Sequence, residues 1–229
     1  MDPLRHPPLT SAAVSTVFQN NLHVSETRAK FHDEIKGRFP FVYIPTIKDL
    51  TYDLADCQFT SADHKSKVAT NISSFTYETE SYAKRDDFWN EFEWVFQKFA
   101  EIASLREVAG VNLKFQNAVR IDPEIGANFL DYFTLDLVPK TTLPMKMFQI
   151  VGAINFATED GFLQIAFEPP KVGILEAGAI NFSFQFFTAS PTPVDKTLSA
   201  VKIAFESGHK RVEDVFRSIL TSKYWDKIK

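Results

Sequence analysis

One stretch of the sequence repeats apolar side chains at a helical period that no β-strand would accommodate. Between positions 88 and 103 they recur every three or four residues and form one continuous stripe. Asp86 and Asp87 come just before the stripe, where the positive end of a helix dipole favours acidic side chains. We therefore predict a helix that packs a Phe-rich side against the core. The stripe consists of Phe88, Phe92, Val95, Phe96, Phe99, Ile102 and Ala103.

A second long helix is predicted near the C-terminal end of the chain. Thr192 is a good capping residue, Pro193 suits the first helical position, and Asp195 adds an acid in the first turn. The apolar residues that follow again have the spacing of one helix face. They are Leu198, Val201, Phe205, Val212, Val215, Phe216 and Ile219.

Most of the remaining segments favour strands. Ser25 is a capping residue for one further helix, which continues to Arg38 and is ended by Pro40. Residues 111–117 alternate between apolar and polar side chains, which is typical of a strand with one buried face. Composition predicts further strands at 9–20, within 57–82, and at 145–157, 161–168 and 174–188, and a short helix within 126–137.

The order of these segments determines the expected fold class. Long helices follow runs of strands instead of alternating with single strands, which predicts an α+β fold. A mainly antiparallel sheet with the long helices packed on one face would bury the apolar side of each element. We expect a single domain over 1–229 built from two loosely similar halves, and a division into sub-halves 1–122 and 140–229 is the alternative.

The composition is that of a globular chain and excludes several classes of protein. Of 229 residues, 45% are hydrophobic and 24% are charged, unlike disordered, collagen-like or coiled-coil chains. No segment reaches the roughly 20 uninterrupted apolar residues of a membrane helix, and the N-terminal residues lack the apolar region of a secretory signal. The single cysteine, Cys57, excludes an internal disulfide framework. We therefore expect a cytoplasmic protein with no membrane partner.

Phenylalanine is unusually frequent, with 23 residues in 229. This usage favours a core of large aromatic rings, and it also fits an apolar pocket lined by such rings. Under the second interpretation the pocket residues are Phe156, Phe182 and Phe184, all in predicted strands. A domain that binds a small molecule is therefore one of the functions that the sequence leaves open.

Charged and aromatic side chains indicate two surfaces for a macromolecular partner. Trp94 points away from the apolar stripe of its helix, so in an isolated monomer its indole would face water. The intramolecular alternative is that residues 41–56 fold over it. Glu78 and Glu80 share one face of a predicted strand and are candidates for contact with a basic partner, although an exposed strand face is the favoured explanation.

A basic patch is predicted on the last helix, at Lys210, Arg211 and Arg217. Such a patch fits nucleic acid or an acidic protein, and its alternative explanation is an ordinary solvated helix face. The formal net charge of the whole chain is −4, whereas nucleic-acid-binding domains usually carry a clear basic excess. A protein partner or self-association is therefore the stronger expectation.

No pattern of residues indicates a catalytic centre. The five histidines share no motif, and Cys57 is expected to be a small buried side chain instead of a nucleophile. Asp49, Asp53 and Asp56 have helical spacing, which favours a solvated acidic surface and leaves a divalent metal site as the weaker alternative. We predict no catalytic residue, metal or cofactor, and a metal-dependent hydrolase or nuclease ranks last among the possible functions.

Three short motifs resemble a sporadically distributed, functionally uncharacterised family of prokaryotic proteins. Its members open with a Pro-Pro-Ile-Val-Glu-like strand, which resembles Pro7-Pro8-Leu9 here. Their middle helix carries a Tyr…Trp-x-x-Phe signature, matched by Tyr82 with Trp89 and Phe92, and the strand that follows is similar to residues 113–117. The closing helix corresponds to residues 215–221. The acid of the opening motif is absent, and the second Arg of the family's strand is replaced by Lys114.

The resemblance implies an accessory role associated with defence systems or mobile elements. Together with the missing catalytic pattern, it leads us to expect a non-catalytic binding or regulatory protein that acts through a macromolecular partner. The alternatives are the Phe-lined small-molecule domain and the metal-dependent hydrolase described above.

Overall fold

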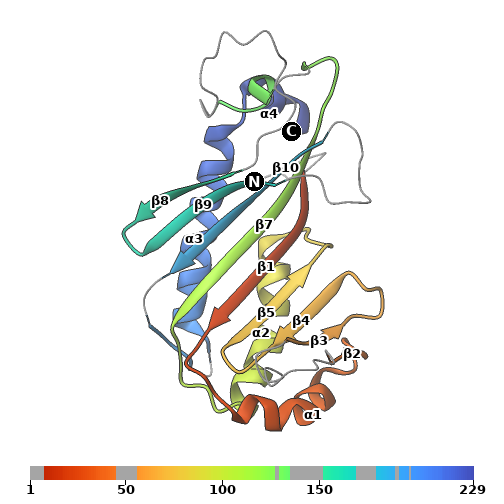
Figure 1. Ribbon diagram of the computed structural model, residues 1–229, viewed down its shortest axis with the longest axis vertical. Coiled ribbons are helices and arrows are strands. Elements are labelled where there is room, and N and C mark those ends of the chain that lie inside the picture. Colours follow the sequence, from red (N-terminus) through yellow and green to blue (C-terminus); the bar gives the residue numbers. More distant parts are fainter. Residues whose placement is uncertain are drawn as a thin grey trace.

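The computed structural model confirms an α+β fold (Figure 1). It describes residues 8–44, 56–126, 129–134, 152–168, 179–188, 191–195 and 197–229. Within them, nine strands form one antiparallel sheet in the order β2-β3-β4-β5-β1-β7-β10-β9-β8. The strands are β1 (Leu9–Val17), β2 (Phe41–Tyr43), β3 (Cys57–Thr60), β4 (Ser66–Thr70), β5 (Ser74–Thr79), β7 (Gly110–Arg120), β8 (Gly152–Thr158), β9 (Gly161–Glu168) and β10 (Ala179–Thr188).

The centre of the sheet is the antiparallel pair β1 and β7. Ala13 lies opposite Lys114 and Val14 lies opposite Leu113, and the pairing continues along the strands with one irregularity between Leu9 and Ser11. On its other side β1 pairs with β5, and β7 pairs with β10. Every other strand of the sheet is therefore connected to the rest through β1 and β7.

The chain traces a similar path on each side of this central pair. In the N-terminal half, β1 pairs with β5, the last strand of a meander, and the chain then enters helix α2 (Arg85–Ile102). In the C-terminal half, β7 pairs with β10, again the last strand of a meander, and the chain then leads to helix α3 (Ser199–Ile219). The two halves share one continuous sheet, because β1 and β7 are hydrogen-bonded neighbours.

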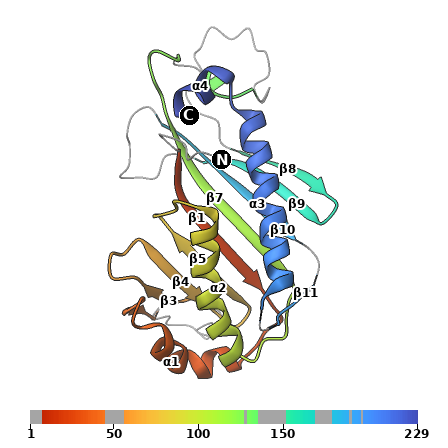
Figure 2. The same ribbon diagram turned by 180° about the vertical axis from the view of Figure 1, so that it is seen from behind.

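The helices cover one face of the sheet (Figure 2). Buried Phe residues of helices and strands form much of the core. Helix α1 (His23–Ile35) contributes Phe31, whose ring contacts Phe59 of β3 and Phe75 of β5. Phe96 and Phe99 of α2 also contact Phe75. The predicted stripe of α2 is confirmed, and its side chains at 88, 92, 95, 96 and 99 are buried.

Helix α3 lies very close to the sheet at Gly208. A Cβ placed there would come 2.4 Å from Phe186 Cδ1 and 2.8 Å from Leu113 Cδ1, so a larger residue would displace either these side chains or the helix. Further along α3, Phe216 contacts Phe182 and Phe184. The aromatic core is thus continuous from α1 to the end of α3.

The predicted start of the last helix is wrong. Thr192 and Pro193 form a short strand, β11 (Thr192–Pro193), which pairs with β6 (Glu107–Val108), and α3 begins at Ser199. Asp195 still acts near the helix start, because its Oδ1 accepts hydrogen bonds from the backbone N–H groups of Thr197 and Ser199. The prediction that Asp195 lies near the helix start is therefore confirmed. The capping role predicted for Thr192 is wrong, because Thr192 pairs with Val108, which is distant in sequence.

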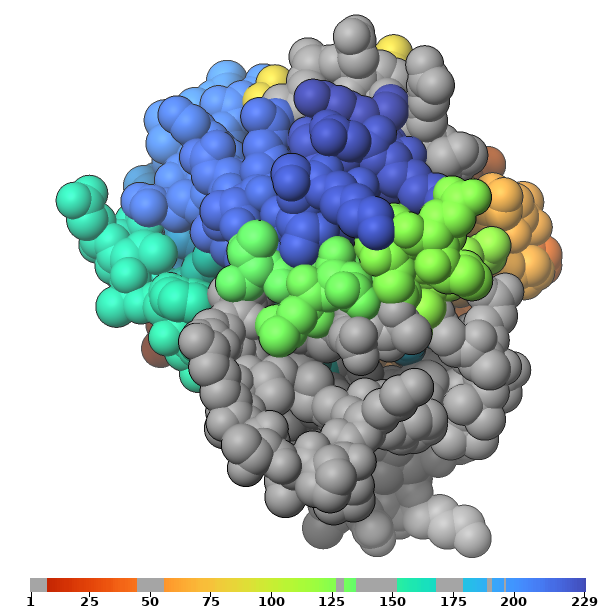
Figure 3. Space-filling view, turned by 90° about the horizontal axis from the view of Figure 1, so that it is seen from above, coloured from red at the N-terminus to blue at the C-terminus, as the bar shows by residue number. Residues whose placement is uncertain are grey.

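The C-terminal end of the chain packs against the segment that follows β7 (Figure 3). Thr221 precedes the short helix α4 (Ser222–Ile228), caps Tyr224 N–H, and donates its hydroxyl to the carbonyl of Asp131. Asp131 belongs to a 3₁₀ turn, η2 (Phe129–Asp131), where a short helix was predicted. Lys227 also pairs with Asp122 and Glu124. Among the described helices, none is long and apolar enough to cross a membrane.

Candidate functional site

The sheet face opposite the helices carries mainly polar and small side chains, and we call it the polar face. Strand register places one row of residues across it, because neighbouring partners in a sheet point to the same side. Most of these side chains are half-buried, as expected for a sheet face that reaches water. The row runs through Asn155, Gln164, Gln185, Lys114, Ala13, Glu78 and Lys67.

Side chains of the polar face pair with one another across the strands. Lys67 Nζ lies 2.8 Å from Glu78 Oε2, and the hydroxyls of Ser15 and Thr76 are 2.9 Å apart. Gln164 donates its amide to Asn155 at 2.9 Å. Such cross-strand pairs fix the orientation of polar groups before any ligand arrives. The polar face therefore presents an ordered set of hydroxyl, amide and charged groups.

Aromatic rings lie near both ends of this face. Phe162 of β9 stacks on Phe187 of β10, with ring centroids 4.5 Å apart, and Phe162 is 38% exposed. At the opposite end, Phe41 of β2 stacks on His64 at 4.9 Å, and Tyr43 is 60% exposed. Aromatic rings beside a hydrogen-bonding surface are a composition found at protein interfaces.

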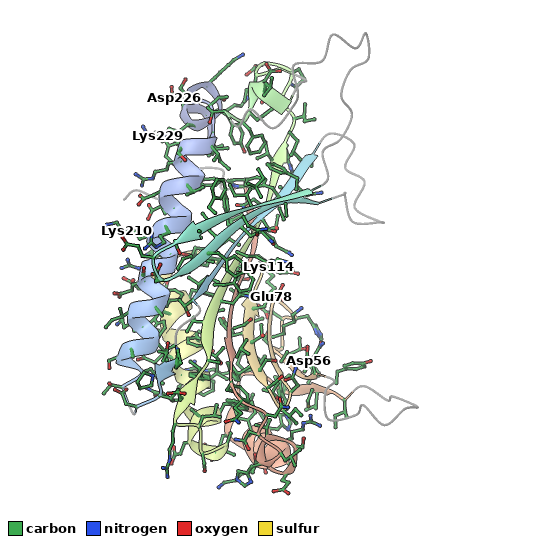
Figure 4. All side chains as sticks on the ribbon, turned by 60° about the vertical axis from the view of Figure 1, so that its left-hand side comes forward. Asp56, Glu78, Lys114, Lys210, Asp226 and Lys229 are labelled. Atoms are coloured by element: carbon green, nitrogen blue, oxygen red, sulfur yellow. The ribbon has the colours of Figure 1, made fainter. Side chains whose placement is uncertain are left out.

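The two predicted acidic candidates lie at the end of β5. Glu78 lies on the polar face, paired with Lys67, and Lys114 stands two strands away beyond the small Ala13. Figure 4 shows Glu78 and Lys114 close together on the sheet, with Lys210 on α3 at the opposite side. Glu80 lies just past the end of β5, where its N–H donates to the carbonyl of Lys65. This bond continues the pairing of β4 with β5 by one residue, and contact of Glu78 and Glu80 with a basic partner stays a prediction.

The predicted basic patch on α3 is largely neutralised by ion pairs. Arg211 Nη2 lies 3.0 Å from Asp160 Oδ1, in the turn between β8 and β9. Arg217 Nη2 lies 2.8 Å from Glu213 Oε1, one helical turn away. Lys210 remains exposed. Instead of the expected patch of positive charge, the structure has two local ion pairs and one exposed lysine.

Asp160 also fixes the β8–β9 hairpin to helix α3. Its Oδ2 accepts a hydrogen bond from the hydroxyl of Ser207 at 3.0 Å. Burial by itself would raise the pKa of the Asp160 carboxyl, but this hydrogen bond and the nearby Arg211 lower it overall. The carboxylate therefore stays charged and holds the hairpin in place.

The expectation that the Trp94 indole faces water is wrong. Trp94 is half-buried, and the guanidinium of Arg38 lies 4.0 Å from the centre of its ring. Arg38 also pairs with Glu91 at 2.7 Å, and Lys98 pairs with Glu34 of α1 at 2.9 Å. The described cover is intramolecular, as the alternative interpretation proposed, and it includes Arg38, which follows α1. Of the predicted covering segment 41–56, residues 45–55 lie outside the described residues.

The three Phe residues of the predicted pocket have different surroundings. Phe182 and Phe184 are each 1% exposed, and their rings lie 5.5 Å apart within the aromatic core. Phe156 belongs to β8 at the edge of the sheet and is 42% exposed. Strand β9 separates β8 from β10, so the three rings do not surround one opening.

The predicted metal-ligand and cysteine candidates that the structure describes are Asp56 and Cys57. Asp49 and Asp53 lie outside the described residues, whereas Asp56 accepts a hydrogen bond from Asn71 at 2.8 Å. In the part of the chain that the structure describes, no three His, Cys, Asp or Glu side chains form a group suited to a metal ion. Cys57 is buried as expected, and burial raises the pKa of its thiol.

A half-buried histidine–tyrosine pair is a feature that the sequence patterns do not predict. Tyr82 precedes α2, and its hydroxyl lies 2.9 Å from Nε2 of His209 on α3. The imidazole packs against Phe115 and Phe205. Burial lowers the pKa of His209 and raises the pKa of Tyr82, so both groups stay neutral. The position of His209 at the edge of its helical stripe was the available signal, but its partner lies 127 positions away.

Comparisons with known proteins add no assignment. No model of a protein family matches the chain, and no curated protein matches it. The resemblance to the sporadically distributed prokaryotic family therefore rests on its motifs alone.

The cover over Trp94 predicts the effect of removing the indole. Trp94→Ala should lower the free energy of unfolding by about 2 kcal/mol, because it removes a cation–π contact and a half-buried ring. The mass in solution should stay that of the wild type. Thermal or denaturant unfolding with sedimentation measures both quantities, and Tyr43→Ala at an exposed ring is the matched control. An unchanged stability together with a changed mass would contradict the intramolecular account.

The neutral state of His209 predicts a pH dependence of stability. The unfolded chain binds a proton at this imidazole below pH about 6.5, while the folded chain resists protonation because the group is buried. The His209 contribution to stability is therefore present above that pH and is lost as the pH falls through the lower pKa of the folded state. Glu213 and Asp86 oppose this shift and Arg85 adds to it.

Urea unfolding between pH 7.5 and 5 measures this contribution, with a slope of at most about 1.4 kcal/mol per pH unit for one proton. His209→Gln should flatten the pH profile over this range. His23→Gln, at an exposed position, is the matched control and should keep the wild-type profile. Identical profiles for His209→Gln and the wild type would contradict the assignment.

Proposed function

We propose that this protein is a non-catalytic binding protein that docks a polypeptide partner on its polar face. The observation that carries the proposal is the row of ordered polar side chains across the sheet, with Lys114 and Glu78 near its middle. Stacked or exposed aromatic rings near both ends provide large contact areas at little conformational cost. Among the described elements, the helices lie on the other face of the sheet (Figure 2).

The composition of the polar face favours a polypeptide over nucleic acid. Along the row, Lys67 and Lys114 carry positive charge, and Glu78 neutralises one of them. A phosphate backbone would require several unpaired cations in such a surface. Amide and hydroxyl groups, in contrast, donate to and accept from peptide groups equally well.

An accessory role in a defence system or mobile element, which the family resemblance implies, is part of this proposal. Such proteins act by binding another component, and a docking surface without catalytic machinery fits that role. The small-molecule alternative has less support, because Phe182 and Phe184 are packed inside the core and Phe156 is separated from them. A cytoplasmic location is the setting that we propose for this partnership.

Site-specific crosslinking in the native host tests the polar face as a docking surface. A photoreactive residue placed at Gln185, on the polar face, should give one discrete protein adduct under illumination. The same residue at Ile203, which is 68% exposed on α3, is the matched control and should not give that adduct. Lys114→Glu should reduce the Gln185 adduct about tenfold, because it reverses a charge within the proposed interface. An adduct of equal yield from both positions, or none from Gln185, would contradict the proposal.

A further inference from the structure

Strand β8 forms one edge of the sheet and lacks the features that usually prevent edge strands from pairing. Natural edges carry lysine, proline or bulges, or are very short. The seven residues of β8, Gly-Ala-Ile-Asn-Phe-Ala-Thr, include no charge and no proline, and their register with β9 is regular. Five of the seven are exposed and two are half-buried. Among the described strands, none pairs with the outer side of β8.

The hairpin geometry shows which backbone groups face outward. Thr158 and Gly161 close the two-residue turn between β8 and β9, so they form a hydrogen-bonded pair. Hydrogen-bonded and non-hydrogen-bonded pairs alternate along an antiparallel ladder, which directs the N–H and C=O groups of residues 152, 154, 156 and 158 towards β9. The same groups of Ala153, Asn155 and Ala157 therefore point outward, away from β9.

This outward pattern is self-complementary in the antiparallel direction. If two copies of β8 pair about a two-fold axis at Asn155, then Asn155 lies opposite its own counterpart and Ala153 lies opposite Ala157. All three outward-facing residues then exchange hydrogen bonds with outward-facing residues of the second copy. A shift of the axis to residue 154 or 156 leaves part of the strand unpaired.

The same register also places apolar side chains opposite apolar ones and small side chains opposite small ones. Ile154 would lie opposite Phe156 in non-hydrogen-bonded pairs, where side chains approach most closely. Both residues continue rows of the helix-covered face, because Phe156 is in register with Leu163 and Phe186, and Ile154 with Ile165 and Phe184. Phe156, 42% exposed in one chain, would be covered by the second copy. The small Ala153 and Ala157 would pair on the opposite face.

We propose that the chain forms a two-fold symmetric dimer through antiparallel pairing of β8 with β8 of a second copy. The dimer joins the two nine-stranded sheets into one continuous sheet. The inference goes beyond the proposed function, because it concerns the sheet edge and stands whether or not the polar face binds a partner. Figure 1 shows the β8–β9 hairpin projecting from the body of the molecule, where a second copy has access to it.

Sedimentation equilibrium from low to high micromolar concentration tests the dimer. The wild type should approach twice the monomer mass of 26.1 kDa. Asn155→Pro removes one outward N–H and is compatible with the single chain, since proline is tolerated where an edge N–H faces solvent. Phe156→Lys places a charge in the apolar pair. Each change should raise the dissociation constant about tenfold or more.

Two controls separate loss of the dimer from a general effect of charge or from loss of folding. Ile203→Lys adds the same charge at an exposed apolar residue on α3 and should leave the dimer intact. Circular dichroism checks that each variant is folded, and Phe156→Lys decides the outcome if Asn155→Pro does not fold. A wild type that stays monomeric would overturn the proposal, and so would a dimer that persists in folded Phe156→Lys. A dimer lost in Phe156→Lys but kept in Ile203→Lys would support it.

Discussion

The hydrogen-bonded pairing of β1 with β7 is the interaction on which the rest of the structure depends. These two strands are distant in sequence and are the sole connection between the N-terminal and C-terminal parts of the described sheet. The long helices pack on β1, β7 and the strands that pair with them. Gly208 allows α3 to lie against Leu113 of β7. Without it, β1 and β7 would each keep a neighbour on one side only, and the polar face would be divided in two.

The alternation of side chains along these strands then determines what each face of the sheet can do. Leu113 and Phe115 point towards the helices and join the aromatic core, while Asn112, Lys114 and Gln116 belong to the polar face. A single-residue slip in register would exchange the two sets. The large number of Phe residues is therefore explained mainly by the core between sheet and helices. The residues that alternate with the buried ones along each strand give the polar face its composition.

The periodicity of the sequence predicts individual helices and strands but not the contacts between distant segments. The stripe of α2 and the alternation in β7 predicted both elements, because burial of one side leaves a local repeat. Contacts between distant segments leave no such repeat. The sequence therefore does not predict the pairing of Thr192 with Val108 or the cover of Arg38 on Trp94. It marks His209 at the edge of a helical stripe but does not identify Tyr82 as its partner. Phe156 was misassigned to a pocket, since its strand lies at the sheet edge.

Native-state hydrogen exchange tests directly whether the two halves form one cooperative unit around β1 and β7. If they do, the amides of both strands should be the slowest to exchange, and both should open with the same free energy, equal to that of global unfolding. The same denaturant dependence should hold for Ala13 and Lys114, which lie opposite each other. Opening of β7, β10 and β9 at a lower free energy, while β1 and β5 stay protected, would contradict the account.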